Sequence, residues 1–390
     1  TGKRICRMTY SIIQKSQLEG ALRLDAEYYQ TEYLEIENKI KNVKHTTIKE
    51  IVQNVFSGPF GSTLKSESYQ NSGIPFIRIG DISDIFIQKH TMVFISEDEH
   101  KRIYSTRLNS GDIVLSKIGT VGRLSVIDDE FDEVNISENN IGIRLQNLNE
   151  NIRSFILFFL LCKYGQTQIF RKASGNIQLK LNVEDIENVL LPVIQNNQNK
   201  IFANYFDQLT DSRKESIKFY QQAESLLLTE LGIKDFQENA ELFSIVNLSD
   251  CQKANRIDAE YFQPKFAELI SKIKLHHPKK LGELVSMTKG FEPGSEAYQE
   301  YGAPFVRVSS LSKDGIDIND QKFLKDELFQ KLKQNFQPQV SEILLTKDAT
   351  PGIAYAIKEP INGIISSGLL KLKLKADIEP EYLTLCLNSI

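Results

Sequence analysis

Short apolar runs of strand length recur along most of the chain, separated by turns that carry Gly, Pro or polar residues. In the first half they lie at residues 74–79, 113–116, 121–127 and 141–145, and in the second at 343–346, 353–357 and 369–374. The runs are rich in β-branched residues, as strands are. In the last run Lys371, Lys373 and Lys375 alternate with leucines. The pattern predicts an α+β fold rich in antiparallel strands.

One segment has a different periodicity. From about residue 199 to 231 the chain contains neither Gly nor Pro, and its apolar residues, such as Ile201, Tyr205 and Leu209, follow helical spacing. Gly232 is suited to end a helix there. Such a helix would be roughly 50 Å long. Its sustained apolar face favours packing against another long helix in a coiled coil.

An internal repeat organises the chain. The octapeptide Arg23-Leu-Asp-Ala-Glu-Tyr-Tyr-Gln30 recurs as Arg256-Ile-Asp-Ala-Glu-Tyr-Phe-Gln263, with six of eight positions identical at an offset of 233. Three more blocks follow in the same order at offsets of 229 to 233, pairing 48–52 with 281–285, 74–78 with 303–307, and 111–117 with 341–347. Ordered blocks at a nearly constant offset indicate duplication of a whole domain, because the period is too long for a solenoid repeat.

The repeat predicts the domain organisation. We expect a first domain at residues 1–194, a connecting long helix at 195–235 and a second domain at 236–390. The helix equivalent to that of the first copy would start near residue 430, by adding the offset of 233 to 199. We therefore expect the second copy to be incomplete in this sequence, as in a fragment of a longer protein.

Composition and charge restrict the classes of protein. The 390 residues, 41% hydrophobic and 25% charged, are typical of a globular chain of two or three domains. The net charge of −4 argues against a uniformly basic nucleic-acid-binding protein. Residues 251–375, however, hold 19 Lys and Arg against 15 Asp and Glu, a local net of +4, so the remainder carries −8. A mildly basic second copy permits contact with phosphates.

The cysteines and apolar runs predict a cytoplasmic location without a membrane partner. Cys6, Cys162, Cys251 and Cys386 are scattered, as in reduced compartments. The longest apolar run has eight residues, at 155–162, which is far short of a membrane span.

The motifs of several catalytic classes are absent from the sequence. No GxGxxG follows a predicted strand, and neither GxxxxGK[ST] nor HExxH occurs. A nuclease of the PD…ExK type needs an acidic residue two before its lysine, where Lys117 and Lys347 have leucine. We expect no catalytic residue, no metal ligand and no cofactor bound by this chain.

Three loops carry candidate binding residues. The loop Ser57-Gly-Pro-Phe-Gly-Ser-Thr-Leu-Lys65 offers backbone amides, hydroxyls and a lysine that suit phosphate contacts; the alternative is a tight surface turn. Lys117-Ile-Gly-Thr-Val-Gly-Arg123 and Lys347-Asp-Ala-Thr-Pro-Gly-Ile353 place a lysine at a strand end before a Thr and Gly turn, as in backbone-amide nests for anions. The alternative is a hairpin turn with an exposed lysine.

Arg78 and Arg307 both leave a strand into a loop, and Arg is the commonest reader of guanine. The alternative for each is a structural ion pair. The complete set of expected DNA-binding residues is Ser57, Gly58, Phe60, Ser62, Lys65, Arg78, Lys117, Thr120, Arg123, Lys289, Arg307, Lys313, Lys347 and Thr350.

Together these motifs resemble one family, the specificity (S) subunits of type I DNA restriction-modification enzymes. The resemblance covers essentially the whole chain. It depends on the duplicated Asp-Ala-Glu-Tyr-aromatic block, the Gly-x-Pro-Phe-x-Arg strand, the block from Gly111 to Gly122, and the segment from Gly175 to Val193 that leads into the long helix.

The resemblance implies a fold and a division of labour. It implies two target recognition domains, each reading one half of a split site in double-stranded DNA. The conserved helices would pair, set the half-site spacing and dock DNA methyltransferase (modification) subunits. Catalysis would belong to the partners: S-adenosylmethionine-dependent adenine methylation by the modification subunit, and ATP- and Mg-dependent translocation and cleavage by the restriction subunit. This sequence departs from the family in lacking the second helix.

Two alternatives remain at this stage. The chain could be the recognition portion of a single-chain type IIG restriction-methylation enzyme. It could also be a scaffold that binds protein or carbohydrate through the same loops. DNA affinity that falls steeply with salt would separate a DNA reader from such a scaffold.

Overall fold

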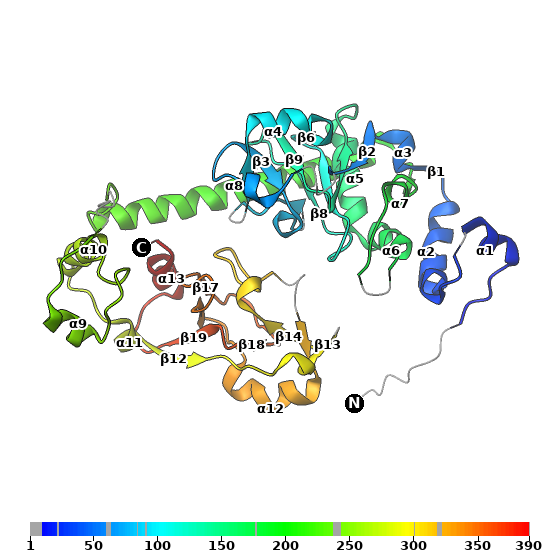
Figure 1. The fold of residues 1–390 in the computed structure, drawn as a ribbon. Coiled ribbons are helices and arrows are strands. Elements are labelled where there is room, and N and C mark those ends of the chain that lie inside the picture. Colours follow the sequence, from blue (N-terminus) through cyan, green and yellow to red (C-terminus); the bar gives the residue numbers. More distant parts are fainter. Residues whose placement is uncertain are drawn as a thin grey trace. The chain divides into compact units, whose positions relative to one another are not determined.

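The computed structural model describes residues 10–21, 23–59, 64–83, 85–89, 92–175, 178–236, 243–299, 301–317 and 322–389. The chain forms two compact units, Thr1–Ser212 and Arg213–Ile390. The boundary falls inside the long helix α8 (Asn196–Glu230), which Figure 1 draws in green. Gly232, with a φ of +65°, follows this helix. A long helix between the two copies is confirmed, and it spans Asn196–Glu230. The division of the chain at 1–194, 195–235 and 236–390 stays a prediction.

The first unit is an α+β assembly. Its helical elements are α1 (Lys15–Ala21), η1 (Ala26–Tyr29), α2 (Thr31–Lys41), α3 (Ile48–Ile51), η2 (Ser66–Ser68), η3 (Ile79–Asp81), α4 (Glu97–Arg102), η4 (Tyr104–Thr106), α5 (Glu150–Leu161), α6 (Lys163–Lys172) and α7 (Val183–Glu187). Its strands are β1 (His45–Thr47), β2 (Asn54–Ser57), β3 (Ile74–Ile77), β4 (Ile85–Phe86), β5 (Val93–Ile95), β6 (Arg107–Asn109), β7 (Ile113–Ser116), β8 (Leu124–Val126), β9 (Glu133–Ile136), β10 (Asn140–Arg144) and β11 (Leu190–Pro192).

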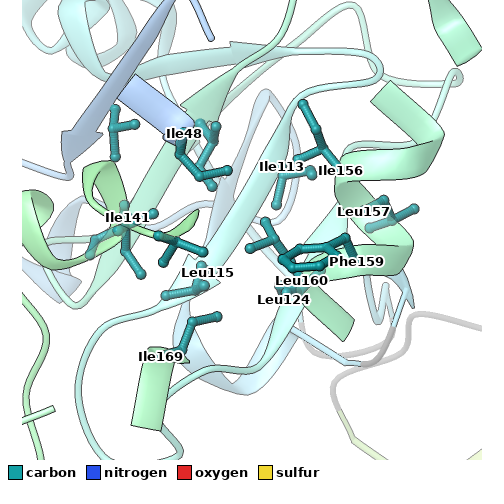
Figure 2. Close-up of a cluster of buried hydrophobic side chains, with 14 of the residues drawn as sticks. Ile48, Ile113, Leu115, Leu124, Ile141, Ile156, Leu157, Phe159, Leu160 and Ile169 are labelled. Atoms are coloured by element: carbon teal, nitrogen blue, oxygen red, sulfur yellow. The ribbon is translucent and has the colours of Figure 1, made fainter. Parts of the chain in front are cut away.

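Three sheets organise this unit. They have the strand orders β2-β10-β7-β8-β4, β5-β3-β9-β6 and β1-β11. Most neighbours are antiparallel, whereas β3 pairs with β9, and β4 with β8, in parallel. Figure 2 shows the main core, where Leu115 and Ile141 of the sheet meet Ile156 and Leu160 of α5 and Ile169 of α6. These side chains are fully buried, so the central strands carry apolar residues on the face that packs against α5 and α6.

The second unit repeats this plan. Its helical elements are α9 (Leu248–Ala254), α10 (Pro264–Lys274), α11 (Leu281–Leu284), η5 (Ser295–Ala297), η6 (Val308–Ser310), α12 (Asp326–Phe336) and α13 (Pro380–Ser389). Its strands are β12 (Val285–Lys289), β13 (Tyr298–Gln299), β14 (Ala303–Val306), β15 (Lys322–Leu324), β16 (Ile343–Thr346), β17 (Ala354–Ala356), β18 (Ile364–Ile365) and β19 (Leu369–Leu374). They form sheets of order β12-β19-β16-β17 and β13-β15-β14-β18.

Register shows that the two units are copies. The order β12-β19-β16-β17 reproduces β2-β10-β7-β8, and β15-β14-β18 reproduces β5-β3-β9. Ile113 faces Val126 between β7 and β8, while Ile343 faces Ala356 between β16 and β17. The duplication predicted from four sequence blocks therefore extends to strand order and pairing.

The repeat also begins earlier than the sequence blocks indicated. Ser11 Oγ donates to the backbone oxygen of Tyr29 at 2.5 Å, and Ser244 Oγ donates to that of Phe262 at 2.8 Å. Both pairs share the offset of 233. Since α1 and α9 also stand at this offset, each copy starts before the octapeptide.

Candidate nucleic-acid interface

In the first unit, strand ends bring two candidate residues together. Ser57 ends β2 and Lys117 follows β7, and both strands flank β10. Lys117 Nζ donates to Ser57 Oγ over 3.0 Å. Gly58 then approaches the backbone of Ser137 so closely that a Cβ would lie 2.0 Å from the carbonyl oxygen. Only glycine fits there, so the loop after β2 is held beside the lysine.

The turn after Lys117 has a defined backbone. Gly119 and Gly122 have φ values of +78° and +88°, which favour glycine. Ser116 N donates to Arg123 O at 2.8 Å, and Gly122 N donates to Ser116 O at 3.2 Å. Arg123 Nη1 donates to the backbone oxygen of Ile82 at 3.3 Å. The buried Thr120 Oγ1 has no hydrogen-bond partner among the described residues.

The second unit keeps the turn and changes its side chains. Ala349 and Gly352, the counterparts of Gly119 and Gly122, have φ values of +59° and +102°. Thr346 N donates to Ile353 O at 2.9 Å, as Ser116 does to Arg123. Thr350 is exposed. Lys347 Nζ lies 2.6 Å from the carboxylate of Asp348, so a cation at the same position has a different partner.

The loop after β12 matches the loop after β2. Exposed Lys289 ends the strand. A Cβ on the following Gly290 would lie 2.1 Å from the backbone oxygen of Ser366, as Gly58 approaches Ser137. In this loop Glu292 Oε2 accepts a hydrogen bond from Ser367 Oγ at 2.7 Å. The second loop therefore carries a carboxylate three residues after Lys289.

The paired arginines also differ. Arg78 pairs with the fully buried Asp81, with 3.3 Å between Nε and Oδ2, and lies 5.9 Å from the ring centroid of Tyr69. This geometry corresponds to the structural ion pair. Its counterpart Arg307 lines an open pocket of about 490 Å³ with Tyr298, Glu292 and Thr350. Neither arrangement tests base reading, which remains a prediction for both.

The remaining candidates are dispersed. Lys65 is exposed just before η2. Lys313 Nζ donates to the backbone oxygen of Asn388 at the end of α13, at 2.9 Å, rather than joining the Lys347 turn. Phe60 and Ser62 lie outside the described residues.

Residues 174 and 178–181, which the site prediction omitted, pack beside the turn that follows Lys117. Ser174 and Lys180 exchange two backbone hydrogen bonds of 2.8 and 2.9 Å, and Leu181 N donates to Lys117 O at 3.0 Å. Gln178 Nε2 lies 3.9 Å from the Cβ position of Gly119. Lys180 and Gln178 thus adjoin the candidate interface, about 60 residues from it in sequence. Backbone pairing with Lys117 and Ile118 brings them there.

The acidic residues five positions before the two lysines have structural roles. Asp112 accepts hydrogen bonds from the backbone nitrogens of Leu145 at 2.7 Å and Asn109 at 2.9 Å, and its burial raises its pKa. Glu342 accepts one from Gln339 N at 2.8 Å. Both therefore fix the chain where a strand begins. Across the described residues no group of three His, Cys, Asp or Glu side chains could hold a metal ion, and no described helix has the length and apolarity to span a membrane.

Comparison with known proteins defines the class. The family model of the type I restriction modification DNA specificity domain matches residues 26–223, a little over half of the chain. The chain belongs to this family. It is a DNA sequence recognition subunit of the restriction-modification class and not its catalytic component, as the motifs predicted. The reading as part of a type IIG enzyme is not favoured.

Solved structures similar to the chain include the type I restriction-modification S subunit from M. genitalium. It is 14% identical with a TM-score of 0.36, and the match covers 89% of this chain and 77% of that one. The HsdS subunit from Thermoanaerobacter tengcongensis is 15% identical with a TM-score of 0.30, covering 89% and 79%. The type IIG endonuclease BpuSI is 12% identical with a TM-score of 0.35, covering 50% and 30%. No curated protein matches the chain.

Proposed function

We propose that each unit reads one half of a split DNA site through the loops at its strand ends. The main support for the proposal comes from the turns that follow Lys117 and Lys347, which we call the tips. They share one backbone conformation but carry different side chains. Lys117 meets Ser57 in the first tip, while Lys347 meets Asp348 in the second. A fixed turn with exchanged side chains changes the hydrogen-bond groups offered to base edges without changing the fold.

The long helix supports a second part of the proposal. Ile201, Tyr205 and Phe219 of α8 are 53%, 61% and 58% exposed, and Leu226 is 63% exposed. An exposed apolar face of this length is suited to pack against another helix. We propose that α8 sets the spacing of the half-sites and contributes to docking of modification subunits in the cytoplasm. S-adenosylmethionine, ATP and Mg would bind to the modification and restriction partners.

Binding to duplex DNA over a salt series tests the proposal. The chain, assembled with its modification subunit, should lose affinity steeply and linearly on a log–log plot as salt rises, because phosphate contacts release counterions. Methylation mapping in a host that expresses both subunits should then return a split motif with a non-specific spacer. Binding that is absent or insensitive to salt would refute DNA recognition through these units.

A further inference from the structure

The second unit has a polar groove that the loop tips do not explain. It has a volume of about 960 Å³ and lies between α12 and the face of β12 and β19 that carries Ser286, Thr288, Lys371 and Lys373. Helix α12 adds Lys331 and Lys333, together with Gln330 and Gln334. Lysines from two elements therefore converge on one channel.

The charge of this groove is largely uncompensated. Lys371 is 9% exposed and has a partner: its Nζ lies 3.6 Å from Glu342 and donates to Gln337 O at 3.2 Å. Lys331, Lys333 and Lys373 are exposed, and no carboxylate of the described residues lies within 4.0 Å of their ammonium groups. Three cations thus face solvent in a channel whose other lining groups are mostly amides and hydroxyls.

The equivalent surface of the first unit is closed. Strand register equates Gly142 and Arg144 of β10 with Lys371 and Lys373 of β19, and Phe56 with Thr288. The Phe56 ring covers Gly142, since a Cβ there would lie 2.6 Å from Cζ. Arg144 stacks on this ring at 4.3 Å and donates to Ser105 O at 2.6 Å and Arg107 O at 2.8 Å. The Arg144 guanidinium is therefore engaged by contacts within the first unit.

The groove lies on the same strand that leads into the second candidate interface. Thr288 lines it, and the next residue along β12 is Lys289, whose side chain belongs to the opposite face of the strand. The groove lysines are therefore a set of cations separate from the candidate at the end of β12. The groove also accounts for part of the local net charge of +4 within a chain of net −4.

We propose that this lysine groove binds the phosphate backbone of DNA beside the half-site of the second unit. The proposal rests on the proposed function and adds a difference between the units. The second unit would contact DNA phosphates through a surface that Phe56 and Arg144 cover in the first unit. Exposed lysines and amides suit phosphate oxygens, and such contacts position a duplex without reading its sequence.

A triple variant tests the groove. Lys331, Lys333 and Lys373 are changed to Ala in the full chain assembled with its modification subunit. Each lysine that neutralises a phosphate contributes about 0.9 to the slope of log affinity against log salt. We expect the slope on a random-sequence duplex to become shallower by roughly 2.7. The methylated motif should keep both half-sites, because backbone contacts carry no base information.

The control removes the same charge from the same unit. Lys274, Lys279 and Lys280 lie outside the groove and are exposed, so their replacement by Ala should change the slope much less. Equal slopes in the two triple variants would overturn the groove assignment while leaving DNA recognition intact. The Lys331/Lys333/Lys373 variant could instead lose the modification subunit while its salt slope stays unchanged. That result would show that the groove binds protein, and it would also overturn the groove assignment. A wild-type complex without salt-dependent binding would refute both proposals.

Discussion

Lys117 and Lys347 occupy one position in two copies of the same turn, yet their ammonium groups meet different partners. Lys117 donates to Ser57 Oγ at 3.0 Å, which leaves its charge uncompensated there. Lys347 lies 2.6 Å from Asp348 Oδ1. The same backbone therefore presents a net cation in the first unit and a nearly neutral pair in the second, so the two tips should attract phosphate to different degrees.

We predict that Lys117→Ala weakens DNA binding by about 1 kcal/mol, roughly fivefold, without unfolding the protein, because one charged contact is lost. Lys347→Ala should also weaken binding, since Asp348 then faces the phosphates alone. A second change, Asp348→Ala, should restore part of that loss by removing the repulsion. Fluorescence anisotropy with a duplex measures all three variants. Unchanged affinity in both lysine variants would contradict their place in the interface.

The duplicated octapeptide forms the same arginine–aspartate–tyrosine cluster in both copies. Among the described residues, only the arginine of the first copy also binds another element. Arg23 pairs with Asp25 at 2.7 Å and lies 4.7 Å from the Tyr28 ring centroid, as Arg256 does with Asp258 at 2.6 Å and Tyr261 at 4.7 Å. Arg23 Nη1 also donates to Lys172 O at 3.1 Å and Ala173 O at 3.3 Å. These carbonyls end α6, where a cation is favourable.

We predict that Arg23→Ala lowers the stability of the first unit by about 1 kcal/mol, because carbonyls of α6 lose a charged donor. Hydrogen exchange should accelerate in the last turn of α6. The matched change Arg256→Ala should leave the unfolding midpoint unchanged, because its contacts in the described chain are with an exposed carboxylate and ring. Equal destabilisation by the two changes would contradict the helix-end role.

The effect of Arg23→Ala should also depend on pH. The hydrogen bond from Arg23 lowers the pKa of Asp25. A lowered folded-state pKa gives stability that is present above the unfolded value, about pH 4, and is lost as pH falls through the folded value. The difference between wild type and variant in urea unfolding should therefore narrow below about pH 4 and keep the part due to the carbonyls of α6.

Local pattern predicted the longer elements and missed those that depend on pairing. The runs at 113–116, 343–346 and 369–374 are β7, β16 and β19, and the helix predicted near 199–231 is α8. Strands of two or three residues, such as β4 and β6, have too few positions to show a period. The parallel pairing of β3 with β9 is also invisible locally, because it is set by contacts about 60 residues apart.

The candidate interface was predictable to the same extent. Lys117 was found because its strand and turn are local signals, and Ser57 because its loop is rich in Gly and Ser. Their hydrogen bond depends on β2 and β7 both pairing with β10. Lys180 joins the turn only through its bridge to Ile118, and the groove lysines converge from α12 and β19. The contacts between these residues depend on pairing between distant strands, which local sequence patterns do not show.

At the scale of the whole molecule, comparison of the two copies separates the positions that fix the loops from the positions that vary. The close approaches of Gly58 to Ser137 O and of Gly290 to Ser366 O, 2.0 and 2.1 Å from a built Cβ, hold both loops at the same place on their sheets. The residues that follow differ between the copies. Since the fixed glycine carries the geometry, the loop beyond it can vary without cost to the fold.

We predict that replacing the loop at residues 57–65 with the loop that follows β12, with its glycine kept in register, changes only one half of the methylated site. The sheet order of the first unit supports either loop, because both leave the same strand position. Methylation mapping should show an altered half-site for the first unit, with the other half-site and the spacer unchanged. The reciprocal graft into the second unit is the matched control and should alter the other half alone. If neither graft changed either half, these loops would not read the bases, and the remaining candidates at the tips, Lys117 and Lys347 with their turns, would have to account for sequence recognition.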